Sequence, residues 1–305
     1  MNVALLYLLN TIALPIAVTA ATAWVARQRG LSGSDLLALT LGFIASYTGV
    51  FELSGLWGTD ATRWVIWGAL IMGGLTAITP RALRGVSSVF GVSLALYLCL
   101  SPLAGMWREG IVKPLVTEWV LGAWLLICLV CLVVVLTSQP EQAVAGEDET
   151  ELSLSGVSPA HFASLALCYA IAAPCVGLSG SASLAQLLGA LGLSTASVGV
   201  LGLRRGAQLS LSAYLCAYAA LALTLVSAHF YLTPGFPSAI ASLIIITPAT
   251  VTLTARWRGA QFKRVLMSLL VSAPLLSLAL ALTASHELAK AEAEAEEVDE
   301  FGASY

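Results

Sequence analysis

The residues best suited to chemistry are four ionisable side chains at the edges of very apolar stretches, namely Glu52, Asp60, Arg63 and Glu118. An ionisable group beside a hydrophobic run is costly to keep in lipid unless it is paired or hydrated, which makes each of them a functional candidate. A carboxylate here would bind a cation or take up a proton, with Arg63 as its counter-charge. The alternative is structural, because such side chains also reach into the headgroup region or form ion pairs.

Farther into the apolar stretches, the polar groups are neutral. Tyr169, Gln186, Tyr214 and Tyr218 are the candidates to line a cavity for a small neutral or amphipathic solute. Tyr214 and Tyr218 are four residues apart, so they share one face of a helix. Hydroxyls that bond to neighbouring helices are the competing interpretation. No Lys, Asp or Glu lies in the middle of a long apolar run, which argues against a proton pump built on buried charges.

Familiar catalytic and metal-binding patterns are absent from the sequence. There is no Ser-His-Asp arrangement, no glycine-rich nucleotide loop after a strand and no zinc-ligand spacing. The three histidines are far apart, near predicted helix ends, and all six cysteines lie inside apolar runs. Cys128 and Cys131, within ICLVCLVVV, are typical of packing thiols rather than a redox pair. We therefore expect no enzyme activity, no cofactor and no metal site.

Composition sets the class of protein that must position these groups. Of 305 residues, 58% are hydrophobic and 10% are charged, whereas a soluble domain carries roughly 25% charged residues. A lipid-facing surface excludes charge, because each charge at a helix centre costs about 2.5 to 3.5 kcal/mol. The composition predicts an all-α polytopic membrane protein whose main partner is the lipid bilayer. Nothing in the charge pattern predicts nucleic-acid binding.

A membrane-spanning helix needs about 20 mostly apolar residues, and ten such runs are present. They cover residues 3–26, 35–55, 61–79, 86–106, 114–137, 159–178, 184–203, 208–230, 236–255 and 265–285. The chain thus divides into a five-helix half (1–138), a polar acidic linker (139–158), a second five-helix half (159–285) and an acidic solvated tail (286–305). The Gly- and Ser-rich stretch 177–202 predicts a central helix, because small residues let helices approach closely.

Basic residues predict the orientation, because cytoplasmic loops of membrane proteins are enriched in Lys and Arg. With the N-terminus outside, ten of the 14 basic residues fall on the inner side. We therefore expect both termini outside and the 139–158 linker in the cytoplasm, with a bacterial inner membrane as the simplest setting. No basic residue precedes the first run, which is also too long for the core of a signal peptide, so we expect it to be retained.

Two halves of five helices each must be inverted relative to each other if they are homologous, an architecture common among carriers. In length and helix count alone, the layout resembles the ten-helix drug/metabolite exporters and the auxin and bile-acid carriers, without a sequence motif of either group. Outside termini disagree with the drug/metabolite exporters. They agree better with the auxin-type carriers, whose paired polar crossover sites are missing here.

Two functions therefore stay open. The first is a secondary transporter, or permease, for a small neutral or amphipathic solute, driven by an ion that Glu52 or Glu118 helps to bind. The second is a non-catalytic membrane subunit or scaffold that packs against membrane-protein partners. A hydrated cavity reaching mid-membrane beside Tyr169, Gln186 or Tyr214 would favour transport, whereas a solidly packed bundle with an exposed apolar groove would favour the subunit.

Overall fold

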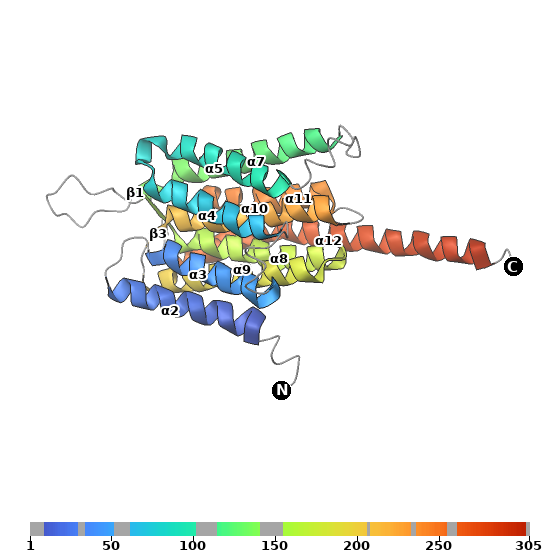
Figure 1. The fold of residues 1–305 in the computed structure, drawn as a ribbon, viewed down its shortest axis with the longest axis horizontal. Helices are drawn as coiled ribbons and strands as arrows, with labels where there is room; N and C mark the ends of the chain where they lie inside the picture. The colour runs from blue at the N-terminus through green and yellow to red at the C-terminus, as the bar shows by residue number, and fades with distance from the viewer. Residues whose placement is uncertain are drawn as a thin grey trace.

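The computed structural model describes residues 9–29, 34–51, 62–101, 115–140, 155–205, 208–232, 236–254 and 261–302. The elements of the first half are η1 (Leu9–Ala13), α2 (Leu14–Gln28), α3 (Ser34–Phe51), α4 (Arg63–Ile78), η3 (Arg81–Leu83), α5 (Arg84–Leu100) and α7 (Leu115–Thr137). They are followed by β1 (Gln139–Pro140), β2 (Ser155–Val157), α8 (Pro159–Leu178), α9 (Ala182–Arg205), β3 (Leu209–Ser210), α10 (Leu211–Tyr231), α11 (Ser238–Thr254) and α12 (Gln261–Gly302). The helices form one bundle, from which α12 projects toward the C-terminus (Figure 1).

Each of the ten predicted apolar runs overlaps one of the ten α-helices in the described ranges, which confirms the all-α prediction. Seven stretches are long and apolar enough to cross a membrane: η1 with α2, then α3, α7, α8, α9, α10 and the apolar part of α12. Helices α4, α5 and α11 are apolar but shorter within the described residues. Ten as the number of membrane spans stays a prediction. The tail predicted from residue 286 continues α12 as helix to Gly302.

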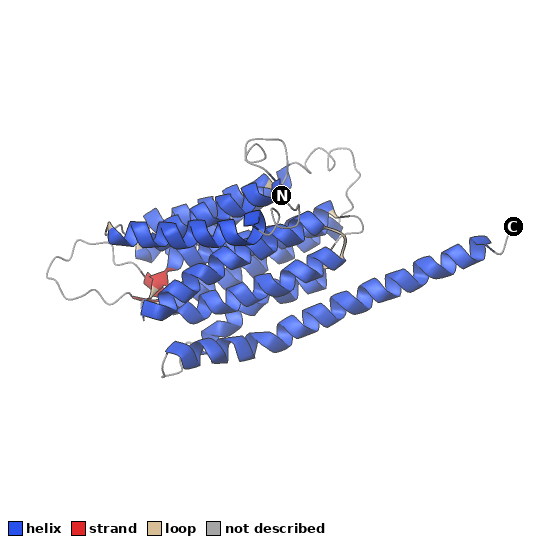
Figure 2. Ribbon diagram, turned by 90° about the horizontal axis from the view of Figure 1, so that it is seen from below, coloured by secondary structure: helices blue, strands red, loops and turns tan. Residues whose placement is uncertain are grey.

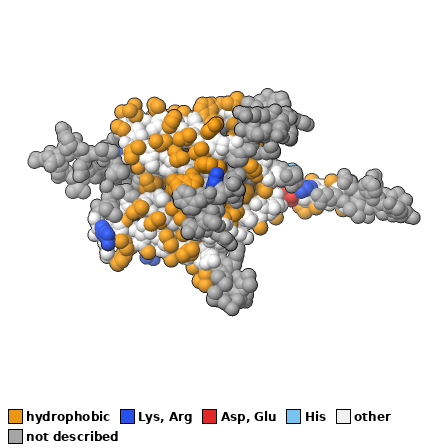
Figure 3. Space-filling model, in the orientation of Figure 1, with side chains coloured by type: hydrophobic (Ala, Val, Ile, Leu, Met, Phe, Trp, Pro, Cys, Tyr) orange, Lys and Arg blue, Asp and Glu red, His pale blue; other side chains and the backbone are white. Residues whose placement is uncertain are grey.

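The outer surface of the bundle is apolar. On α5, Val86, Phe90 and Tyr97 are 70%, 60% and 70% exposed, and their spacing places them on one helix face. Figure 3 shows hydrophobic side chains spread over the visible face of the bundle, with few Lys or Arg side chains among them. A soluble protein rarely exposes so extensive an apolar surface, and this surface is compatible with contact to lipid.

Helix α10 occupies the centre of the bundle. It packs against α3, α4, α5, α7, α8, α9 and α11, and every residue from Leu211 to Ala228 is buried. A helix that is apolar all round belongs in a core. Close contact with α4 depends on glycine: a Cβ on Gly73 would lie 2.8 Å from Cβ of Cys216. The centre is thus filled by a helix.

A small sheet marks one end of the bundle, which we call the sheet end (Figures 1 and 2). Strand β2 pairs antiparallel with β1 and with β3, so that Gly156 lies opposite both Gln139 and Ser210. Strands of two or three residues were not predicted from the sequence. Consecutive helices run in alternate directions, so the first residues of α2 and the last of α12 lie at the opposite end (Figure 1). The side of a membrane that each end would face stays a prediction.

Candidate functional site

The predicted ionisable group is only partly described. Glu52 and Asp60 lie outside the described residues, and the side chain of Glu118, on α7, does as well. Arg63 begins α4, and its guanidinium carbon lies 4.7 Å from the centre of the Trp64 ring, a cation–π contact. Its buried Nε has no hydrogen-bond partner among the described residues. Pairing of Arg63 with a carboxylate stays a prediction.

The three tyrosines come together in the core, where all are fully buried. The Tyr169 hydroxyl donates to the Ala217 carbonyl at 2.7 Å, which joins α8 to α10. The Tyr218 hydroxyl donates to the Ile245 carbonyl at 3.1 Å, which joins α10 to α11. These two hydroxyls are therefore bonded to neighbouring helices, which is the structural interpretation of the sequence pattern.

Tyr214 differs from the other two tyrosines. Its buried hydroxyl has no hydrogen-bond partner among the described residues. Its ring meets His161 and Phe162 edge to face, with ring centres 5.8 and 5.6 Å away. Because a buried hydroxyl without a partner costs about 1 to 3 kcal/mol, Tyr214 is the tyrosine that packing alone does not explain.

Gln186 is separated from the tyrosine hydroxyls. It lines a groove of about 490 Å³ between η1, α8 and α9. The other lining residues are mostly small or apolar: Thr11, Ile12, Ala166, Ala170, Ala173, Gly189, Ala190, Gly192, Leu193 and Ala196. Ile12 and Ala170 are exposed, so the groove opens on the outside of the bundle. A second outer groove, of about 280 Å³, lies between α5 and α7 beside Tyr97 and Trp124.

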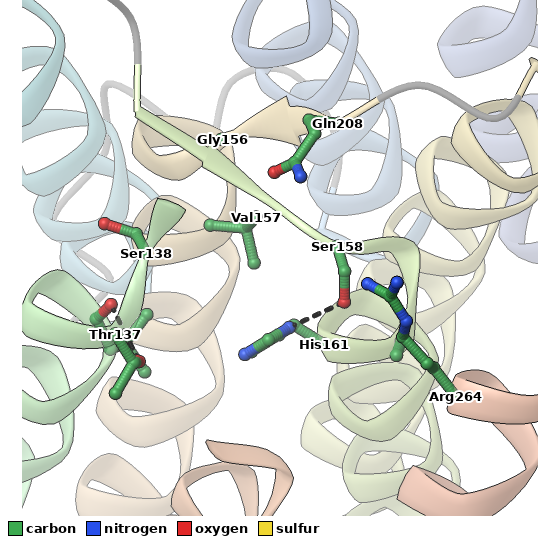
Figure 4. A pocket seen from close by; sticks show the side chains of 10 residues that line it. Thr137, Ser138, Gly156, Val157, Ser158, His161, Gln208 and Arg264 are labelled. Carbon is green, nitrogen blue, oxygen red and sulfur yellow. Dashed lines mark hydrogen bonds between the residues drawn. The ribbon is translucent and has the colours of Figure 1, made fainter. Parts of the chain in front are cut away.

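A polar pocket at the sheet end was not predicted from the sequence (Figure 4). This linker pocket, of about 30 Å³, is lined by Val134, Thr137, Ser138, Gly156, Val157, Ser158, Ala160, His161, Gln208 and Arg264. These residues come from the end of α7, strand β2, the start of α8, the approach to β3 and the start of α12. The only feature of the sequence that could have indicated this pocket is that the helix ends forming it carry polar residues, and these ends lie far apart along the chain.

Backbone geometry places the polar groups of the linker pocket. A Cβ on Gly156 would lie 2.6 Å from Oε1 of Gln208, so glycine is needed for this amide to lie across β2. His161 stands in the first turn of α8 and is 7% exposed. Its Nδ1 lies 3.0 Å from Oγ of Ser158 (Figure 4). This contact fixes the orientation of the imidazole.

Two arginines near helix ends form polar contacts within the first half of the chain. Arg27 forms an ion pair with Asp35, which is 8% exposed. Arg84, one of the ten basic residues that the sequence places on the inner side, is 3% exposed, and its Nε donates to the Thr79 carbonyl at 3.2 Å. Basic residues that the sequence assigns only to orientation therefore also hold the connections between helices.

No family model, curated protein or solved structure matches this chain. Among the described residues, no three His, Cys, Asp or Glu side chains are grouped so that they could hold a metal ion. The chemistry that the described residues offer is therefore hydrogen bonding at the linker pocket and packing at the outer grooves.

Proposed function

We propose that the chain is an integral membrane protein that acts as a non-catalytic subunit or scaffold and packs against membrane-protein partners through its outer grooves. The observation that carries this proposal is the filled centre. Helix α10 is buried from Leu211 to Ala228, whereas the grooves of about 490 and 280 Å³ both lie at the outer surface. The proposal includes ten spans in two inverted halves, in a bacterial inner membrane with the linker in the cytoplasm.

Helix pairing supports the inverted halves. Helix α2 packs on α3 as α8 packs on α9, and α5 packs on α7 as α11 packs on α12. The contacts of α3 with α9 and of α4 with α10 join helices that occupy the same position in each half. Contacts between equivalent helices are expected where a pseudo-two-fold axis relates two repeats.

The larger groove is suited to a partner helix. Ala166 and Ala170 are four residues apart on α8, and Gly189 of α9 has open space where a Cβ would stand. Small residues let two helix backbones approach closely, and such packing drives helix association in lipid. A photo-crosslinking residue at Ala170 should give one discrete protein adduct in native membranes, whereas the same residue at exposed Leu129, outside both grooves, should give none.

A secondary transporter of a small neutral or amphipathic solute is the second candidate. The observation in its favour is the Tyr214 hydroxyl, which is buried without a partner among the described residues. A conformation that admitted solute or water to the centre would supply that partner. In this mechanism Glu52 or Glu118 would bind the coupling ion.

The native cysteines distinguish the two candidates. All six, Cys99, Cys128, Cys131, Cys168, Cys175 and Cys216, are buried. For a scaffold with a filled centre, a water-soluble maleimide should leave all six thiols unmodified in nanodiscs and modify all six after denaturation in SDS, as counted by intact mass. Native labelling of Cys168 or Cys216 that changed with an imposed ion gradient would instead support transport and contradict the scaffold.

A further inference from the structure

We infer that the linker pocket binds a phosphate group, supplied either as free phosphate or by the headgroup of an anionic phospholipid. This inference goes beyond the proposed function and rests on other residues. The grooves that would hold a partner lie along the sides of the bundle, whereas the linker pocket lies at its sheet end. Failure of either proposal therefore leaves the other standing.

The charge of the pocket selects an anion. Arg264 and His161 line it together with the amide of Gln208, and no carboxylate lines it among the described residues. A guanidinium presents paired N–H donors that match the spacing of phosphate oxygens. The pocket also adjoins the N-terminus of α8, where Ala160 belongs to the lining. The backbone N–H groups and the positive end of the helix dipole at that position favour an anion.

The imidazole of His161, a residue that is 7% exposed, faces the pocket. Because Nδ1 of His161 faces Ser158, the other ring nitrogen, Nε2, lies on the opposite side of the imidazole and is directed across the pocket toward Thr137 (Figure 4). The hydrogen bond that joins the His161 ring to the described residues is the one at Nδ1. A ring nitrogen that faces a pocket is available to a ligand or a water molecule there. When the Ser158 hydroxyl donates to Nδ1, Nε2–H becomes a donor directed at the space that an anion would occupy.

The dimensions of the pocket limit the ligand. A volume of about 30 Å³ exceeds the roughly 10 to 15 Å³ that one water molecule needs, so the enclosed part accepts a few compact oxygens rather than an organic solute. Arg264 is half-buried in the first turn of α12, and Thr137 ends α7. In the proposed membrane topology, the ends of these two helices lie at the depth of the lipid headgroups. A phospholipid phosphate would therefore be within reach of the pocket.

Two probes and one matched pair of variants test the inference. The full chain is purified in phosphatidylcholine nanodiscs, and its melting temperature is measured with inorganic phosphate against chloride at equal ionic strength. Native mass spectrometry then compares retention of phosphatidylglycerol with retention of phosphatidylcholine. Arg264→Gln should weaken binding about tenfold, as expected for losing hydrogen bonds to a charged group. Lys263→Gln is the control, because Lys263 is adjacent and exposed but does not line the pocket.

The outcomes separate the sources. Stabilisation by phosphate that Arg264→Gln removes supports a free-phosphate site, and selective retention of phosphatidylglycerol that Arg264→Gln removes supports a lipid site. Binding of neither probe, or equal loss in both variants, overturns the inference and leaves a water-filled pocket or a diffuse basic surface. If Arg264→Gln does not fold, Arg264→Lys decides: it keeps the charge but loses the paired donors, so binding should still fall below that of the wild type.

Discussion

The carboxylate of Asp35 accepts a hydrogen bond from the backbone N–H of Ser210, with Oδ2 and N 3.4 Å apart, although the two residues are 175 positions apart in the chain. The other carboxylate oxygen, Oδ1, pairs with Arg27. One side chain thus holds the connection between α2 and α3 against the start of α10. Ser210 in turn caps α10, since its Oγ accepts from the N–H of Ala213. The first half of the chain is therefore fastened to the central helix at the sheet end.

Removing the charge that Asp35 pairs with should destabilise the fold. Arg27→Gln leaves a mostly buried carboxylate without its cation, and we expect a loss of about 1 to 3 kcal/mol in the free energy of unfolding. Arg29→Gln is the control, because Arg29 lies two residues away and is exposed; its effect should stay within about 0.5 kcal/mol. Denaturant unfolding followed by tryptophan fluorescence measures both. Equal effects would show that the Arg27–Asp35 pair contributes nothing specific.

The helices were predictable because a long apolar run is a local property of the sequence. The predicted span 159–178 coincides with α8 (Pro159–Leu178), and each other run overlaps one helix. The centre of the bundle was not predictable in the same way. The small residues of 177–202 indicated a central helix, yet 56% of the apolar 18-residue window of α9 is buried, whereas α10 is buried throughout Leu211–Ala228. Small residues indicate that another helix can approach closely, but they do not indicate whether this approach occurs in the core or at an outer groove.

The contacts at the sheet end depend on tertiary structure that no local pattern reveals. Strands of two or three residues are too short to show a period of two, so β1, β2 and β3 carry no signal. Asp35 resembled any acidic residue at a helix start, and His161 resembled an interfacial side chain. Their roles arise because the ends of α7, α8, α10 and α12 meet at one place (Figure 1).

Two glycines on α9 should respond oppositely to the same substitution. A Cβ at Gly192 would lie 2.7 Å from Cβ of Tyr169, whereas Gly189 has nothing within 4 Å of that position. Gly192→Ala should therefore cost about 1 to 3 kcal/mol through overpacking. Gly189→Ala should be neutral or stabilising by up to about 1 kcal/mol, because alanine favours helix. Melting temperatures of the two variants test this contrast, and a loss at Gly189 would mean that its side of α9 is packed.

Two tyrosines should respond differently to loss of the hydroxyl. Tyr169→Phe removes a donor that bonds the Ala217 carbonyl and should cost about 0.5 to 1.5 kcal/mol. Tyr214→Phe removes a hydroxyl without a partner among the described residues, so it should be neutral or slightly stabilising. The two variants differ from the wild type by the same single oxygen, which makes each the control for the other. A loss in Tyr214→Phe equal to that in Tyr169→Phe would reveal a bound water or solute at the centre.

Single cysteines on α12 should report the predicted orientation. Lys263 precedes Arg264, which lines the pocket at the sheet end, and Ala291 lies 28 residues further along the same helix; both Lys263 and Ala291 are exposed. That separation corresponds to roughly 42 Å of helix, more than the approximately 30 Å of a hydrocarbon core. With the linker in the cytoplasm, a membrane-impermeant maleimide added to intact cells should label Ala291→Cys, and it should label Lys263→Cys only after permeabilisation. The six buried native thiols should give a low background. The reverse pattern would invert the orientation, whereas labelling of both in intact cells would mean that this part of α12 does not cross the membrane.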